Sequence, residues 1–365
     1  MKVIKKEDRN IGIDLLRIIS MIMVVLLHVL KFGGILDNTK FLSINYEIAW
    51  LLEIIAYCAV NCYALISGYV GITTKIKYQN IIKLWLRVIF YTTTITLIFY
   101  IINPNTISNL NLLKVFFPIL FSTYWYFTAY FCMFFFIPYL NILINNLNKH
   151  QAIKLLIIII ILFSVVTTIT PNDIFTINKG YSVIWLSLLY LIGGIIKKYN
   201  LFKNWPTKKL IIGFSLCILI TWLSKYLTEF TTLEISNKII NSMYFIKYNS
   251  ITILFEAIFL LIIFSRIKIL SGAKYIKYIS SLSFSIYLIH MHPLIVEHLI
   301  KNKFIGYTQL PFYTFILAII SSTIFICVLC IIIDMIRNKL FEKIKINQFS
   351  DYIVSKISYI VNLCE

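Results

Sequence analysis

Charged residues are scarce in this chain of 365 residues. Asp, Glu, Lys and Arg together make up 13% of it, whereas about a quarter of a soluble domain is charged. This scarcity excludes an ordinary soluble domain. Hydrophobic residues account for 60% of the chain and aromatic residues for 16%, and the class that fits such a balance is a polytopic helical membrane protein.

Acidic residues are especially few. The chain has 15 Asp and Glu against 34 Lys and Arg, a formal net charge of +19. The basic residues fall in short loops between apolar runs, as they do in membrane proteins, so we expect no nucleic-acid partner. No cleavable signal sequence is expected either, because the first apolar run is long, carries charges and lacks a small-residue cleavage site.

Paired metal-ligand motifs are missing. Cys327 and Cys330 have the spacing of zinc ligands, but they lie in an apolar run without a second pair. We therefore expect no metal site, and no tightly bound cofactor. Six of the seven cysteines lie in apolar segments, and the set is Cys58, Cys62, Cys132, Cys217, Cys327, Cys330 and Cys364.

Ten apolar segments are each long enough to cross roughly 30 Å of hydrocarbon. They are residues 11–31, 47–70, 81–102, 123–145, 152–170, 181–197, 208–228, 249–265, 280–300 and 311–336. The sequence thus predicts an all-α polytopic transmembrane bundle of about ten spans. With the N-terminus inside, most basic residues fall on the inner side, which predicts that both termini are cytoplasmic. We expect a membrane-embedded domain at 1–340 and an amphipathic cytoplasmic tail at 341–365.

The first span carries two ionisable residues, Arg17 and His28, eleven positions apart. At about 100° per residue they project from the same helix face, roughly 16 Å apart along the axis. Nothing in the segment obviously neutralises both. Ionisable groups at membrane depth are costly unless they line a cavity or find partners, so the pair suggests a polar tunnel. The alternative is an arginine that extends to the interface and a histidine near the other end.

Further polar residues lie in the other apolar segments. Glu53 and Glu256 are deep, and each either pairs with a base such as Arg17, Lys83 or Arg87, or lines a cavity. Asp334 and Glu297 are expected at the interface. The cluster Tyr124-Trp125-Tyr126 is either an aromatic belt or part of a binding site. The remaining polar residues at membrane depth are Asn61, Ser67, Asn141, His290 and His292.

Four segments in order resemble the acyltransferase-3 family of integral membrane acyltransferases. The first is Ile13-Asp-Leu-Leu-Arg17 followed by His28, which is similar to that family's basic residue, ten positions and histidine. The others are Ile66-Ser-Gly-Tyr69, Tyr124-Trp125-Tyr126 with Pro138-Tyr-Leu-Asn141, and Tyr287-Leu-Ile-His290. The resemblance covers residues 8 to about 336.

The resemblance implies transfer of an acyl group, usually acetyl from acetyl-CoA, to a hydroxyl of a surface or lipid-linked glycan. The essential pair would be Arg17 and His28. His28 suits a general base or a transient acyl carrier, and Arg17 suits the phosphates of CoA. The expected substrate- or donor-binding residues are Glu53, Ser67, Arg87, Trp125, Tyr126, Asn141 and His290.

The expected partners are acyl-CoA, the saccharide acceptor and membrane lipids, and the expected location is a bacterial plasma membrane. Two alternatives remain open. A transporter or flippase for a glycan or lipid-linked sugar also needs a polar tunnel, but its activity requires no acyl donor. A structural subunit of a polysaccharide synthase would tolerate changes at Arg17 and His28. The sequence leaves the acceptor, the acyl chain and the oligomeric state undetermined.

Overall fold

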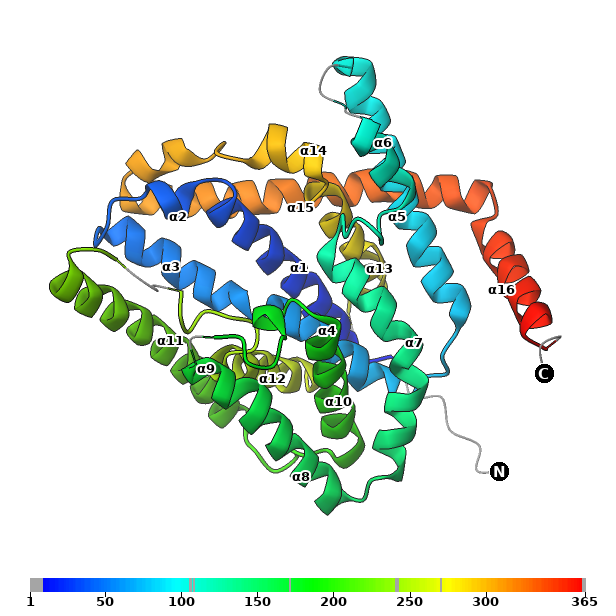
Figure 1. Cartoon of the computed structure of the whole chain (residues 1–365), viewed down its shortest axis with the longest axis horizontal. Coiled ribbons are helices and arrows are strands. Elements are labelled where there is room, and N and C mark those ends of the chain that lie inside the picture. Colours follow the sequence, from blue (N-terminus) through cyan, green and yellow to red (C-terminus); the bar gives the residue numbers. More distant parts are fainter. Residues whose placement is uncertain are drawn as a thin grey trace.

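The computed structural model of the chain consists of helices and connecting loops (Figure 1). It describes residues 9–104, 107, 109–170, 172–239, 243–269 and 271–362, with side chains described for all of these except 109–112 and 357–362. No strand occurs among the described residues, so the predicted all-α class is confirmed. Cys364 lies outside the described residues.

The described residues form sixteen α-helices. They are α1 (Ile11–Lys31), α2 (Ile35–Asn38), α3 (Ile44–Tyr57), α4 (Ala59–Gly71), α5 (Tyr78–Ile102), α6 (Asn109–Phe116), α7 (Trp125–Asn146), α8 (Lys149–Ile160), α9 (Thr167–Ile169), α10 (Val183–Tyr199), α11 (Thr207–Ser236), α12 (Ile251–Ser265), α13 (Ala273–His290), α14 (Pro293–Ile295), α15 (Phe312–Lys343) and α16 (Ile346–Asn362). The described π-helical segments are Ile161–Val166 and Val296–Ile300, and the 3₁₀ segments are Asn178–Gly180 and Ile305–Gln309.

Seven helical segments of the described chain are long and apolar enough to cross a membrane. An eighth is added if α13 and the segment Pro293–Gln309, which are bent by 62° relative to each other, form one broken span. The two other expected spans correspond to α10 and α12, with 17 and 15 residues. Such helices are about 22–26 Å long, shorter than the roughly 30 Å of hydrocarbon. The polytopic bundle is confirmed, whereas the count of ten spans stays a prediction.

The helix α1 lies at the centre of the bundle, in contact with α3, α4, α12, α13 and α15 (Figure 1). Asn10 caps its first turn, because the side chain accepts a hydrogen bond from the backbone N–H of Ile13. Gly12 lets the start of α1 approach the end of α12, since a Cβ at this position would lie 1.9 Å from the backbone oxygen of Phe264. The position of α1 is therefore set at its first turn.

Small residues also bring α4 and α10 together. A Cβ on Gly68 would lie 1.9 Å from the backbone oxygen of Tyr190, and a Cβ on Gly193 would lie 2.1 Å from that of Leu65. Glycines at such a contact let two helix backbones approach closely, which is the usual way to gain packing energy between membrane helices. This close contact holds α4 in place beside α1.

Two charged residues that the sequence placed near the membrane surface are buried. Lys225, expected in an outer segment, is buried in α11, with Nζ 2.8 Å from Oε2 of Glu229. Asp334, expected at the interface, is buried in α15 and ion-paired with Arg337 at 2.8 Å. In both cases the helix continues past the predicted span end and carries the charge together with its partner, whereas the position of either charge relative to the membrane surface stays a prediction.

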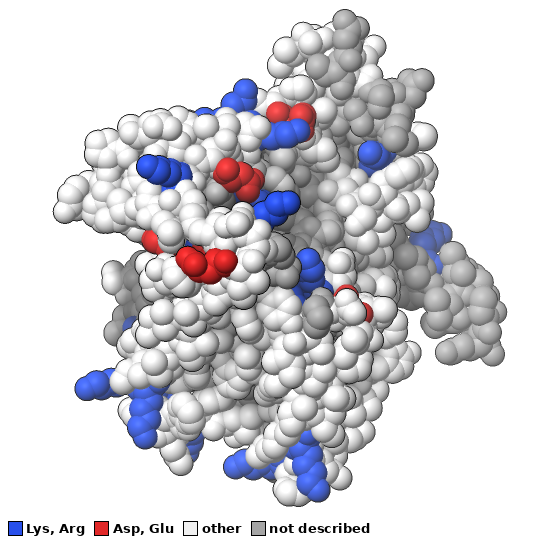
Figure 2. Space-filling model, turned by 60° about the vertical axis from the view of Figure 1, so that its left-hand side comes forward, with Lys and Arg blue, Asp and Glu red and all other residues white. Residues whose placement is uncertain are grey.

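The charges visible on one face of the molecule are unevenly distributed (Figure 2). The lower edge in this view shows Lys and Arg alone among the charged residues, whereas Asp and Glu appear in the upper and middle parts. Between them is a broad uncharged region. An apolar belt with a basic edge is what the positive-inside rule leads one to expect of a membrane protein. The orientation itself stays a prediction.

We predict that the two ends of α11 face opposite sides of the membrane. Lys203 precedes this helix, Lys238 follows it, and both are exposed. In a cysteine-free background, Lys238→Cys should react with a membrane-impermeant maleimide in intact cells, whereas Lys203→Cys should react only after permeabilisation, because the basic side is expected inside. Labelling of both positions from the same side would show that α11 does not cross.

Candidate active site

Two pairs of polar residues join α1 to α13. Near the start of both helices, the hydroxyl of Ser280 donates to Oδ1 of Asp14 at 3.1 Å. Near the end of both, Nδ1 of His28 lies 2.8 Å from Nε2 of His290. Because the pairs occur in the same order along both helices, α1 and α13 run in the same direction. The expected polar face of α1 therefore faces another helix.

The hydrogen bonds of the histidine pair assign its protons. Nδ1 of His290 lies 2.5 Å from the backbone oxygen of Ile286, and this oxygen is only an acceptor, so Nδ1 carries a proton. In a neutral ring Nε2 of His290 is then bare, and it accepts from Nδ1–H of His28. Nε2 of His28 is consequently the nitrogen with the free lone pair. It makes no hydrogen bond to any residue that the structure describes.

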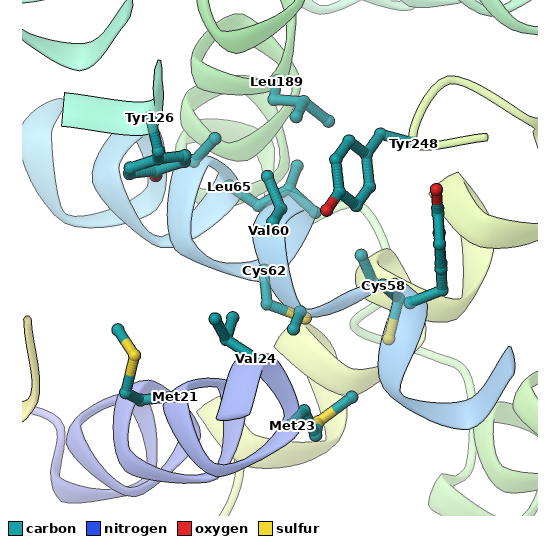
Figure 3. Close-up of a cluster of buried hydrophobic side chains, with 14 of the residues drawn as sticks. Met21, Met23, Val24, Cys58, Val60, Cys62, Leu65, Tyr126, Leu189 and Tyr248 are labelled. Carbon is teal, nitrogen blue, oxygen red and sulfur yellow. The ribbon is translucent and has the colours of Figure 1, made fainter. Parts of the chain in front are cut away.

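His28 lines a cavity whose walls come mainly from α1, α4, α7 and α13. The wall is aromatic and aliphatic, as in most sites that bind small molecules. Figure 3 shows Met21 and Val24 pointing from α1 towards α4, which carries Val60, with the rings of Tyr126 and Tyr248 higher in the same view. The lining residues are Met21, Val24, Leu27, His28, Val60, Tyr63, Trp125, Tyr126, Tyr248, Phe284 and Tyr287.

Aromatic contacts organise the cavity wall. Trp125 stacks on Tyr248 with ring centroids 5.9 Å apart. The hydroxyl of Tyr63 donates to the backbone oxygen of Arg17 at 2.9 Å and lies 3.0 Å from the hydroxyl of Ser283, so α4 is bonded to both α1 and α13. The structure thus places two expected binding residues, Trp125 and Tyr126, around His28.

Arg17 is not part of this cavity. Its Nη1 donates to Oδ1 of Asp14 at 2.8 Å, and Arg9 donates to both oxygens of the same carboxylate. Asp14, one helical turn earlier on the same helix, therefore neutralises Arg17 but not His28, whose hydrogen-bond partner is His290. The side chain of Arg17 is still 26% exposed, and its Nε and Nη2 make no hydrogen bond among the described residues.

A second cleft lies between α5 and α7. Neither Lys83 nor Arg87 in its wall has an ion-pair partner in the described part of the chain. Tyr130 of the same wall stacks on Tyr126 with ring centroids 6.3 Å apart, so the basic cleft and the His28 cavity are one turn of α7 apart. The lining residues are Asn80, Ile81, Lys83, Leu84, Arg87, Tyr130 and Phe134.

Three expected binding residues lie elsewhere. The hydroxyl of Ser67 donates to the backbone oxygen of Tyr63 at 3.0 Å. The amide of Asn141 is occupied on both sides, because Nδ2 donates to the backbone of Gly71 and Oδ1 accepts from Tyr190. Glu53 is buried in α3. None of the three lines the His28 cavity or the basic cleft.

Of the two alternatives expected for Glu53 and Glu256, pairing with a basic residue is not seen among the described residues. Both carboxylates are buried, and neither forms an ion pair with a residue that the structure describes. One of the candidate bases, Arg17, is already paired with Asp14, a carboxylate on its own helix. In the described residues, no group of three or more His, Cys, Asp or Glu side chains lies together as a metal would require.

Sequence reasoning missed four aromatic residues of the cavity: Tyr63, Tyr248, Phe284 and Tyr287. Tyr287 lies one helical turn before His290 in the same segment, so the helix period could have placed both residues on one face. Tyr248 lies in the loop before α12, and no periodicity in the sequence connects it to α1.

Comparison with known families identifies the chain. A family model described as an acyltransferase domain matches residues 10–335. The chain belongs to this family, and it is a membrane acyltransferase by its domain and by its apolar helices. The resemblance to the acyltransferase-3 family is confirmed. Neither the curated proteins nor the solved structures contain a match.

We predict that Asp14 stabilises the start of α1. Asp14→Ala removes the acceptor for Arg9, Arg17 and Ser280, and hydrogen bonds to charged groups contribute about 1.5–3 kcal/mol each. The purified variant should unfold several degrees below the wild type in a thermal melt. The control is Asp37→Ala, whose carboxylate is 59% exposed and pairs with an exposed Lys31, so its melt should be unchanged. Equal melting of both variants and wild type would contradict the prediction.

Proposed function

We propose that the protein transfers an acyl group, most simply acetyl, from acyl-CoA to a hydroxyl of a cell-surface or lipid-linked glycan. The observation that carries this proposal is the hydrogen-bonded pair His28–His290 on the wall of the aromatic cavity. The matched acyltransferase domain supplies the general reaction, and it includes both histidines. The cell membrane is the location in which such an enzyme would meet both substrates.

His28 has the arrangement of a general base. Its Nδ1 proton is directed to His290, so the lone pair of Nε2 is free to take a proton from an acceptor hydroxyl. The hydroxyl oxygen then attacks the thioester carbonyl, the C–S bond breaks, and the leaving thiolate takes up the proton from His28. His290 acts through His28, because its bare nitrogen stabilises the imidazolium that forms during transfer. We therefore assign His290 as a positioning residue.

The acyl-CoA donor would bind in the cleft that is lined by Lys83 and Arg87. CoA carries phosphates, and Lys83 and Arg87 are cations without a carboxylate partner among the described residues. The aromatic pair Tyr130–Tyr126 connects their cleft with the His28 cavity, which offers the pantetheine arm a path to the base. Arg17 lies in the first half of α1, and its Nε and Nη2 make no hydrogen bond among the described residues. It is a further residue that would contact acyl-CoA.

The acceptor fits the cavity wall. Aromatic rings such as Trp125 and Tyr248 are rigid surfaces on which the apolar face of a sugar ring packs, while tyrosine hydroxyls offer hydrogen bonds. The same wall would suit the alternative, a glycan or lipid-linked sugar transporter. That alternative predicts no dependence on an acyl donor. It gives no role to a free imidazole lone pair, which is why we favour acyl transfer.

We predict that His28→Ala abolishes acylation of surface glycans while the protein inserts normally. Loss of a general base typically costs about two to four orders of magnitude in rate. His290→Ala should be impaired less, because Nε2 of His28 remains. The measurement is the mass of surface glycans from strains with equal protein levels. His150→Ala is the control, since this histidine is exposed in the first turn of α8.

Wild-type acylation in the His28→Ala strain would contradict this assignment and favour the transporter. Incubation with labelled acyl-CoA separates the two possible roles of His28. A general base leaves no label on the protein, whereas a covalent carrier yields an acyl-imidazole at His28 when the acceptor is withheld.

We predict that Arg17→Ala weakens donor binding or abolishes activity, and that Arg17→Lys restores it only in part, because a lysine lacks the bidentate fork of a guanidinium. Arg9→Ala is a matched control, since Arg9 shares the Asp14 carboxylate. The apparent KM for acetyl-CoA should rise for Arg17→Ala and stay near the wild-type value for Arg9→Ala. If both variants behave alike, Arg17 acts only through Asp14.

A further inference from the structure

A third cleft lies where α16 meets α5 and α15. In Figure 1 these three helices meet at one side of the bundle, with α16 at the end of the chain. Lys83 and Arg87 come from α5, Arg337 comes from α15, and Asn347 comes from α16. The wall thus combines three cations from two helices that are far apart in the sequence.

Two of these cations, Lys83 and Arg87, have no ion-pair partner among the described residues. Arg337 donates from Nε and Nη2 to the Asp334 carboxylate at 2.8 and 2.9 Å, which leaves Nη1 unused. Arg87 has only long contacts of 3.5 Å to α13, and its Nε is buried without a partner. Lys83 has no ion-pair partner in the described ranges. Arg87 is half-buried, and a partly desolvated guanidinium is stabilised by a nearby anion, so an anion from outside the chain would stabilise this wall.

One acidic residue, Glu342, also lines the cleft. Its Oε1 accepts from Nδ2 of Asn338 at 2.8 Å, and the side chain is exposed. A single exposed carboxylate does not balance Lys83 and Arg87. The cleft therefore favours anionic ligands, and planar guanidinium groups favour phosphate in particular.

Most of this wall lies outside the matched domain. The domain ends at residue 335, whereas Arg337, Asn338, Glu342 and Asn347 follow it. Lys83 and Arg87 belong to the domain and line the cleft beside Tyr130 as well. The C-terminal segment thus adds a second wall to cations that already face the donor cleft.

We propose that this cleft binds a phosphate ester, held by Lys83, Arg87 and Nη1 of Arg337. Two sources have this chemistry: the adenosine bisphosphate end of CoA, which rests on the proposed function, and the headgroup of an anionic lipid. Because Arg87 is shared with the cleft that leads to His28, a phosphate bound here lies beside the proposed path of the donor. The C-terminal helix α16 then completes a ligand site.

The test uses the full chain in phosphatidylcholine nanodiscs. Calorimetry with adenosine 3′,5′-bisphosphate measures the first source, and native mass spectrometry of phosphatidylglycerol retained by the protein measures the second. Lys83→Gln should weaken phosphate binding about tenfold, the usual effect of losing one charged hydrogen bond. Glu342→Gln should strengthen binding severalfold, since it removes the acidic group. Lys75→Gln is the matched control, because Lys75 is exposed and lines none of the three clefts.

Opposite effects of Lys83→Gln and Glu342→Gln on either probe support the phosphate site, and the probe that responds identifies the source. If both variants bind both probes as the wild type does, the proposal is wrong. His28→Ala separates this proposal from the proposed function, because it should bind the bisphosphate normally. Normal bisphosphate binding by a wild-type protein that transfers no acyl group would contradict the proposed function alone.

Discussion

Polar side chains inside a membrane-spanning helix need partners, because hydrocarbon supplies neither hydrogen bonds nor counter-charges. α1 meets this requirement chiefly along α13. Asp14 accepts from Ser280 at one end of the contact, and His28 pairs with His290 at the other. Rotation of either helix would separate both pairs at once. The same contact that satisfies these groups also orients the imidazole that faces the cavity, so the stability of the bundle and the geometry of the site depend on one interface.

Other helices hold α1 and α13 in this contact. α4 approaches α10 through Gly68 and Gly193, where side chains would collide with the opposite backbone. This close packing fixes α4, and α4 in turn carries Tyr63, whose hydroxyl bonds both α1 and α13. On the other side, α7 carries the stacked Tyr126 and Tyr130, which lie between the aromatic cavity and the basic cleft. A thioester donor and a sugar acceptor would thus meet between rigid aromatic walls.

Much of the fold follows from the sequence, because a long apolar run in hydrocarbon has few alternatives to a helix. Hydropathy reports how apolar a segment is, but it does not report direction or continuity. The expected span 47–70 consists of α3 and α4, with a break at Cys58, and the expected span 280–300 bends before Pro293. A proline removes a backbone donor and ends regular helix, but the 62° angle at this break depends on packing.

The candidate site likewise has a part that the sequence predicts and a part that depends on helix packing. Spacing alone placed Arg17 and His28 on one face of one helix, because the period of the α-helix is fixed. It did not give their partners. Asp14 holds Arg17 through a turn of the same helix, whereas His290 reaches His28 from 262 residues away. Helix periodicity describes neighbours within a helix, and only the packing of separate helices decides which side chains meet across them. The sequence by itself determined the apolar helices and the polar face of the first one. The tertiary structure decided which residues that face meets.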